Sequence, residues 1–213
     1  MNRGQVVEAL HEGMALAVRD YHAWTNGASI EEWGVESLLT AACAGALAKA
    51  AAEESHGPFL TLEQTFAGLL EYSERYPAIG RPSKAAEKLK NKPTGRMDIV
   101  IWNRAGTPRA VIEVKRSDGT AGLKEDAERV AGFITTAGRL YDGSVRFGAV
   151  ATLIHASTRE GFLRRKENAR SAAIFEIADR AGLKCSMIGP REIHDPTEGR
   201  DRSVWSYVFL FEG

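Results

Sequence analysis

Two apolar segments of the chain contain charged residues at positions where charges are unusual. Asp98 lies in the run RMDIVIW, and Glu113 and Lys115 lie in the run AVIEVKRS. Charged side chains are rarely placed inside hydrophobic strands without a partner. Two carboxylates that are held close together repel each other, and a divalent cation relieves that repulsion. Because oxygen ligands alone select Mg²⁺ or Mn²⁺, the three residues predict a site for one of these cations.

A β-hairpin is predicted to bring these charges together. Its parts are a strand at 97–102, a turn at 103–108 and a strand at 109–115. Side chains alternate along a strand, so Asp98 is expected on the face opposite Met97 and Ile99. Glu113 and Lys115 share one face of the second strand by the same rule. If the two charged faces coincide, Asp98 and Glu113 converge on one point, with Lys115 close by.

A metal ion beside a lysine is suited to the hydrolysis of phosphodiester bonds. The metal polarises a phosphoryl oxygen and lowers the pKa of a bound water. Lys115 would orient the attacking water and stabilise the charge that develops in the transition state. The structural alternative for Asp98, Glu113 and Lys115 is a cross-strand salt bridge on a half-exposed sheet.

The spacing of these residues resembles the PD-(D/E)xK nuclease superfamily, which has the restriction-endonuclease-like fold. Asp98 is followed, after fourteen residues, by Glu113-Val114-Lys115. The resemblance covers about residues 29–155 and implies a Mg²⁺- or Mn²⁺-dependent nuclease. It implies that Asp98, Glu113 and the main-chain carbonyl of Val114 bind the metal, and that Lys115 is the catalytic lysine. The proline of the motif is absent, because Met97 precedes Asp98.

Members of this superfamily often carry a further acid on the first helix, and Glu36 is the candidate for that metal-site residue. On a helix, Glu36 shares one stripe with Trp33, Thr40, Cys43 and Leu47. A carboxylate in that stripe faces inward and requires a partner, such as Lys115 or a metal-bound water. The alternative is an ordinary charge at the margin of the helix.

The remaining pattern predicts an α/β domain with an αβββαβ core, in which helices flank a mixed central sheet. The long first helix of the core is expected to begin with a capping box at Ser29 and Glu32 and to end near His56. The other expected elements are a helix at 5–24, strands at 59–66, 145–155, 184–188 and 203–211, and helices at 83–89, 123–141 and 158–181. A single domain over 1–213 is expected, with an N-terminal helical extension at 1–28, a core at about 29–155, and a C-terminal helix and strands at 156–213.

Two segments of the chain are strongly basic, although the 213 residues have a formal net charge of zero. Residues 81–96 hold six basic side chains and one acidic, and residues 159–170 hold five and two. A neutral chain does not coat nucleic acid by its net charge, but local patches of this kind can grip phosphates. The alternative is two solvated surface stretches. The residues predicted to bind nucleic acid are Lys88, Lys90, Lys92, Arg96, Arg164 and Arg165.

Several classes of protein are excluded by the composition. No apolar run approaches the roughly 18 residues of a membrane helix, and charged residues interrupt the N-terminal segment, so no signal peptide is expected. Two cysteines cannot build a disulfide framework, and the five histidines show no zinc-ligand spacing. A cytoplasmic protein without a membrane partner is therefore expected. The neutral charge and the size favour dependence on a partner, either a second copy of the chain or a larger complex.

Two functions of different classes remain open. The first is a metal-dependent nuclease acting on DNA. The second is a module on the same fold that binds nucleic acid or a protein without cutting. The retention of Asp98, Glu113 and Lys115 favours the nuclease, because a protein that does not cut has no need for a costly pair of carboxylates.

Overall fold

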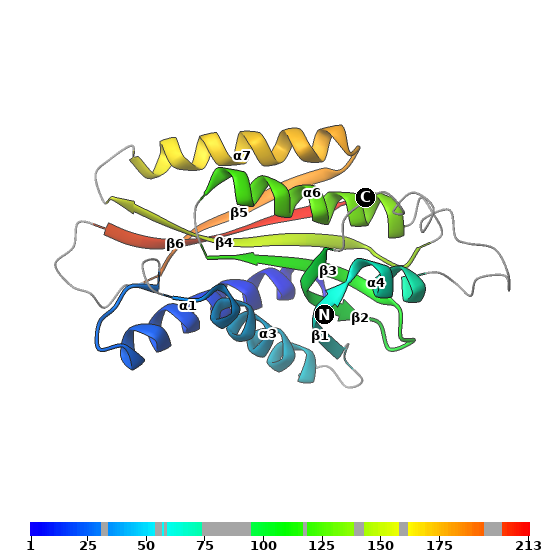
Figure 1. The fold of residues 1–213 in the computed structure, drawn as a ribbon, viewed down its shortest axis with the longest axis horizontal. Coiled ribbons are helices and arrows are strands. Elements are labelled where there is room, and N and C mark those ends of the chain that lie inside the picture. The colour runs from blue at the N-terminus through cyan, green and yellow to red at the C-terminus, as the bar shows by residue number, and fades with distance from the viewer. Residues whose placement is uncertain are drawn as a thin grey trace, which may run out of the picture.

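Six strands form one mixed sheet in the computed structural model, with helices on both faces (Figure 1). The structure describes residues 1–30, 34–53, 57, 59–73, 95–116, 119–138, 143–157, 162–193 and 202–213. The strands are β1 (Phe59–Thr65), β2 (Arg96–Trp102), β3 (Pro108–Lys115), β4 (Phe147–Ser157), β5 (Lys184–Ile193) and β6 (Arg202–Glu212). The helices are α1 (Arg3–Trp24), α3 (Glu36–Ala52), α4 (Phe66–Ser73), α6 (Thr120–Ala137) and α7 (Phe162–Arg180). The expected α/β class, with a mixed sheet flanked by helices, is confirmed.

The order of the strands across the sheet is β1-β2-β3-β4-β6-β5. β3 and β4 are parallel, and the other neighbouring pairs are antiparallel. α6 makes the crossover between the two parallel strands, as a parallel pair requires. The predicted hairpin is confirmed, and its turn runs from Asn103 to Thr107, with Gly106 at a φ of 76° that a residue with a Cβ rarely adopts.

The two faces of the sheet carry separate layers of apolar side chains. Ile99, Ile112 and Val114 pack with residues of α1 and α3, whereas Val100 and Val111 pack with residues of α6 and α7. Figure 1 shows the same division, with α1 and α3 on one side of the sheet and α6 and α7 on the other. The alternation of apolar residues in β2 and β3 therefore places each strand between two layers of helices.

The predicted start of the long core helix is wrong. α3 begins at Glu36, and Val35 precedes it in an extended conformation without a side-chain cap. The Gly34 amide donates a hydrogen bond to the Ile30 carbonyl at 3.0 Å, ahead of the extended Val35. Ser29 therefore does not cap α3, and Glu32 lies outside the described residues. Glycine and a β-branched valine favour this break more than the capping sequence favours a continuous helix.

The helix predicted at 83–89 lies wholly outside the described residues. The helix predicted at 123–141 lies partly outside them. α6 ends at Ala137, so the structure does not describe Tyr141, the last residue expected in that helix. Among the described residues, no helix combines the length and the apolar composition that crossing a membrane would need.

Gly13 sets the close approach of α1 to α3. A Cβ atom at Gly13 would lie 2.4 Å from the Cys43 Cα atom and 2.8 Å from the Cys43 nitrogen. These are backbone atoms of α3, so they cannot rotate away as a side chain would. The contact therefore fixes the position of α3, which carries Glu36 in its first turn.

We expect Gly13→Ala to lower the free energy of unfolding by about 1–3 kcal/mol, because the two helices must separate to admit the methyl group. Gly45→Ala is the matched control, since Gly45 is exposed on α3 and a Cβ atom there would have no neighbour within 4 Å. That change should raise the free energy by about 0.5–1 kcal/mol through helix propensity. Urea denaturation measures both. A gain in stability at both positions would contradict the close contact.

Candidate active site

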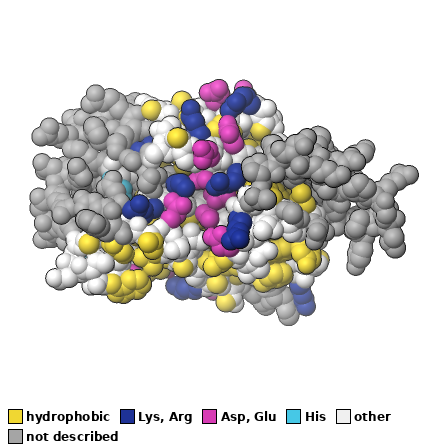
Figure 2. All heavy atoms as spheres, in the orientation of Figure 1, with side chains coloured by type: hydrophobic (Ala, Val, Ile, Leu, Met, Phe, Trp, Pro, Cys, Tyr) yellow, Lys and Arg dark blue, Asp and Glu magenta, His cyan; other side chains and the backbone are white. Residues whose placement is uncertain are grey.

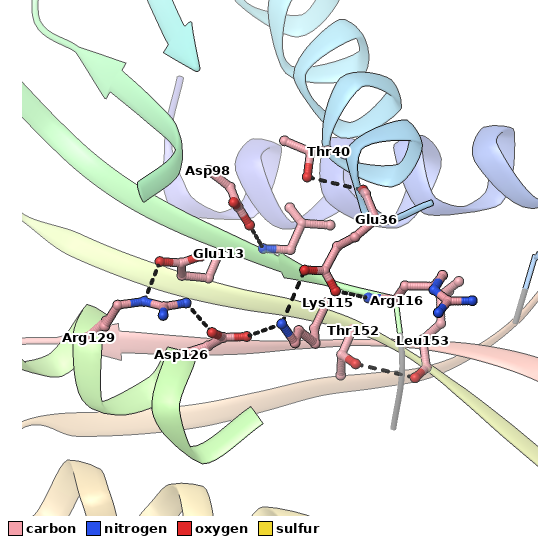
Figure 3. Close-up of polar contacts among 11 residues, drawn as sticks. Glu36, Thr40, Asp98, Glu113, Lys115, Arg116, Asp126, Arg129, Thr152 and Leu153 are labelled. Atoms are coloured by element: carbon pink, nitrogen blue, oxygen red, sulfur yellow. Dashed lines mark hydrogen bonds and ion pairs between the residues drawn. The ribbon is translucent and has the colours of Figure 1, made fainter. Parts of the chain in front are cut away.

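Charged side chains from four elements meet at the carboxyl end of β3 (Figure 3). Glu36 comes from α3, Asp98 from β2, Glu113 and Lys115 from β3, and Asp126 and Arg129 from α6. In Figure 2, acidic and basic side chains interleave across the middle of the visible face. The structure thus brings together Asp98, Glu113, Lys115 and Glu36, as the sequence predicts, and adds two residues of α6.

Asp98 lies where β2 separates from β3. The pairing between these strands includes Ile99 opposite Ile112, and beyond it the Asp98 Oδ2 atom accepts a hydrogen bond from the Val114 amide at 2.7 Å. Met97 packs on the α6 side of the sheet with Val100, so its predicted place beside Ile99 is wrong. The alternation of faces is interrupted here because the strands diverge and the Asp98 carboxylate lies between them. This carboxylate accepts the hydrogen bond of the Val114 amide, which a main-chain carbonyl of β2 would accept in regular pairing.

Glu113 is buried beside a second carboxylate and an arginine. Its side chain is 3% exposed, and its Oε1 atom accepts a hydrogen bond from the Arg129 Nε atom at 3.0 Å. Burial, with the charge of Asp98 as a second cause, raises the pKa of the Glu113 carboxyl to about 9, although Arg129 acts in the opposite direction. The Glu113 carboxyl therefore keeps its proton at neutral pH unless a bound cation displaces that proton.

Lys115 lies between two carboxylates from opposite faces of the sheet. Its Nζ atom is 3.1 Å from the Glu36 Oε1 atom and 3.6 Å from the Asp126 Oδ2 atom. Burial alone would lower the pKa of Lys115, but Asp126 and Glu36 outweigh burial and hold the pKa above its ordinary value. Lys115 therefore stays an ammonium group and can donate hydrogen bonds, but it cannot act as a base at neutral pH.

The Glu36 side chain links the start of α3 to the end of β3. Its second oxygen accepts a hydrogen bond from the Arg116 amide at 3.2 Å. The side chain is 41% exposed, so it lies at the rim of the site and is less inward than the helical stripe predicts. Its place in the first turn of α3 is favourable, because the positive end of the helix dipole stabilises a carboxylate there.

Asp126 and Arg129 are functional candidates that the sequence reasoning missed. They lie one turn apart on α6 and form an ion pair, in which the Arg129 Nη2 atom contacts the Asp126 Oδ1 atom. Burial raises the pKa of Asp126, while Lys115 and Arg129 act to lower it. A signal was present in the sequence, because Asp126 lies three residues after Leu123 and four before Val130 on the apolar stripe of the predicted helix.

The contacts form one chain of alternating charges, visible in Figure 3. It runs from Glu113 to Arg129, then Asp126, Lys115 and Glu36. Each of Asp98, Glu113 and Lys115 has a partner outside the trio, so the predicted alternative of a simple cross-strand salt bridge does not describe the site. With Asp98, four carboxylates face the positive charges of Lys115 and Arg129, which leaves an excess of two negative charges when all are ionised.

The donor atoms at this point suit a small, hard divalent cation. Asp98 and Glu113 offer carboxylate oxygens, and Val114 between Glu113 and Lys115 offers a main-chain carbonyl. In the described part of the chain, no three His, Cys, Asp or Glu residues are grouped as a metal cluster. Mg²⁺ commonly takes one or two carboxylates and keeps several waters, so two carboxylates and one carbonyl fit it better than they fit Zn²⁺.

The residues predicted to bind nucleic acid are described only in part. Lys88, Lys90 and Lys92 lie outside the described residues. Arg96 is exposed at the start of β2, with its guanidinium 3.9 Å from the Glu63 carboxylate. Arg164 and Arg165 belong to the first turn of α7, and the structure does not describe their side chains.

A cavity of about 980 Å³ lies at the other end of β3, with Arg109 and Phe147 among the residues that line it. It shares no lining residue with the charged network. The sequence matches no protein-family model and no curated protein sequence, so the charged network is the feature from which a function can be inferred.

Proposed function

We propose that the protein is a Mg²⁺- or Mn²⁺-dependent nuclease of the PD-(D/E)xK type that hydrolyses phosphodiester bonds of DNA. The observation that carries this proposal is the convergence of Asp98, Glu113 and Lys115 at the end of β3, with Glu36 in hydrogen-bond contact with the lysine. Two carboxylates and an ammonium group are the side chains that metal-assisted phosphoryl chemistry uses. The excess of negative charge around them supports a divalent cation as the missing partner.

The arrangement of the elements supports a restriction-endonuclease-like core. The order α3, β1, β2, β3, α6 and β4 follows the αβββαβ pattern, apart from the short α4 between β1 and β2. β1, β2 and β3 pair as an antiparallel meander, and β4 adds in parallel to β3. This order places the Asp98 strand beside the Glu113 strand and brings α3 and α6 to the same end of the sheet.

Each residue of the site has a role that its environment supports. Asp98, Glu113 and the Val114 carbonyl would hold the cation, which supplies a polarised phosphoryl oxygen and a water of lowered pKa. Lys115 orients the attacking water and donates to the charge that develops on the phosphate. Glu36 and Asp126 keep Lys115 protonated and aimed at the site, as the two contacts of its Nζ atom indicate. The basic segments at 81–96 and 159–170 would contact the DNA backbone.

We expect the purified protein to cleave linear or circular DNA with Mg²⁺ or Mn²⁺ and to leave it intact with EDTA. Asp98→Asn should lose cleavage, because one of the two metal-binding carboxylates is gone. Glu128→Gln is the matched control, since Glu128 is an exposed acid of α6 that pairs with Arg180 and its change should leave the rate unaltered. Cutting by Asp98→Asn at the wild-type rate would contradict the proposal, as would cutting in EDTA.

A second function, a module that binds nucleic acid or a protein without cutting, is favoured by one specific observation. Arg129 holds Glu113, and Glu36 and Asp126 hold Lys115, so the chain itself neutralises part of the site. Calorimetry with Mn²⁺ separates the two functions. A nuclease gives binding heat that is lost in both Asp98→Asn and Glu113→Gln, whereas a module that does not cut gives no heat that depends on these residues.

A further inference from the structure

Arg129 donates a hydrogen bond to Glu113, one of the two carboxylates that the proposed metal site requires. Its Nε atom lies 3.0 Å from the Glu113 Oε1 atom, while its Nη2 atom contacts Asp126. The two acidic side chains are each 3% exposed, but the Arg129 side chain is 36% exposed. Of these three side chains, the arginine is therefore the one that reaches the solvent.

We propose that Arg129 is an exchangeable partner of Glu113: it donates a hydrogen bond to Glu113 in the cation-free protein, leaves Glu113 when a divalent cation binds, and stays paired with Asp126 as a contact for the DNA phosphate. This inference rests on the proposed function. A divalent cation bound to the Glu113 carboxylate and the Arg129 guanidinium at the same carboxylate would repel each other, so the arginine must leave when the cation binds. Asp126 offers the displaced guanidinium a second partner within the same turn of α6.

The surroundings of Arg129 point to the phosphate backbone as its second ligand. A Cβ atom at Gly95 would lie 3.4 Å from the Arg129 Cδ atom, so the stem of the arginine runs beside Gly95. Gly95 precedes Arg96, an exposed basic residue at the start of β2 that is predicted to bind nucleic acid. A guanidinium group presents a planar fork that matches a phosphate with two parallel hydrogen bonds. Binding of the cation and binding of DNA should therefore support each other, because both favour the released arginine.

The first test measures Mn²⁺ affinity by calorimetry without DNA. Arg129→Met removes the group that competes with the cation for Glu113, so Mn²⁺ binding should tighten about tenfold or more. A tenfold gain corresponds to about 1.4 kcal/mol of binding free energy. Arg129→Lys keeps the charge but loses the fork that spans Glu113 and Asp126, so it should tighten binding by a smaller factor. Arg180→Met is the control, because Arg180 pairs with Glu128 in an exposed contact at 3.5 Å and should not alter Mn²⁺ binding.

The second test measures DNA affinity with Ca²⁺ in place of Mg²⁺, so that the DNA is bound without cleavage. Wild-type protein should bind DNA more tightly with Ca²⁺ than with EDTA, and Arg129→Met should lose most of that difference. A merely structural arginine would lower thermal stability and leave both the Mn²⁺ affinity and the Ca²⁺ effect unchanged, which would overturn the inference. If Arg129→Met fails to fold, Arg129→Lys carries both measurements.

The outcomes separate this inference from the proposed nuclease. If the wild-type protein cleaves DNA and both Arg129 variants bind Mn²⁺ with unaltered affinity, the proposed exchange of Arg129 is overturned and the proposed nuclease is not. An absence of Mn²⁺ binding in wild type and in both variants overturns the exchange and the nuclease together. Binding that appears only after Arg129 is replaced supports the exchange and favours the module that does not cut.

Discussion

Replacement of Lys115 by methionine should lower the single-turnover rate of DNA cleavage by about 10²–10³, the usual effect of losing one preorganised transition-state donor. The ammonium group is the donor that Glu36 and Asp126 hold at the end of β3, and methionine fills similar space without a charge. Mn²⁺ affinity should persist or rise, because a positive charge beside the carboxylates has been removed. A loss of rate without a loss of metal affinity would assign Lys115 to the chemical step.

Two further variants sharpen this expectation for Lys115. Lys115→Arg should not restore the rate, because a planar guanidinium cannot replace a compact ammonium between two carboxylates. Lys49→Met is the matched control, since the Lys49 ammonium is 3.4 Å from the Glu12 carboxylate in an exposed pair between α3 and α1. Rapid-quench measurement at saturating Mg²⁺ gives the rates. A rate for Lys115→Met within a few-fold of wild type would mean that the lysine is structural.

Glu113→Gln should abolish cleavage and yet stabilise the cation-free protein. The folded protein holds the pKa of Glu113 at about 9, against an ordinary value of 4.5. Between these two values the unfolded chain has lost the proton that the folded chain keeps, so wild-type stability falls as pH rises through that window. At pH 7 the loss is about 3 kcal/mol, and glutamine, which cannot ionise, avoids it. The variant should therefore be more stable at pH 7 and above.

The measurement is urea denaturation in EDTA at pH 5, 7 and 8.5. The advantage of Glu113→Gln over wild type should be small at pH 5 and should grow at each higher pH. Glu128→Gln, on an exposed acid of α6 that pairs with Arg180, should show no such growth. Mg²⁺ should stabilise wild type and should not stabilise Glu113→Gln. An advantage that is constant over this range would contradict the raised pKa.

Much of the fold could be predicted from the sequence, because it depends on local periodicity. The alternation of apolar residues in 97–102 and 109–115 predicts β2 and β3, and the helical spacing from Leu123 predicts α6. The start of α3 could not be predicted in the same way. The capping sequence at Ser29 is a valid local signal, but the extended Val35 separates it from α3, which begins at Glu36.

The sequence by itself determined that Asp98, Glu113 and Lys115 belong to adjacent strands, because fourteen residues and a turn leave little choice of pairing. It also indicated that an inward carboxylate such as Glu36 needs a partner. Only the tertiary structure decided which partners these charges take. The packing of α6 against the sheet brings Asp126 and Arg129 over β3, and the packing of α3 against the other face brings Glu36 to Lys115. Contacts between residues as far apart as 36 and 115 depend on how the layers stack, and no local pattern in the chain encodes that geometry.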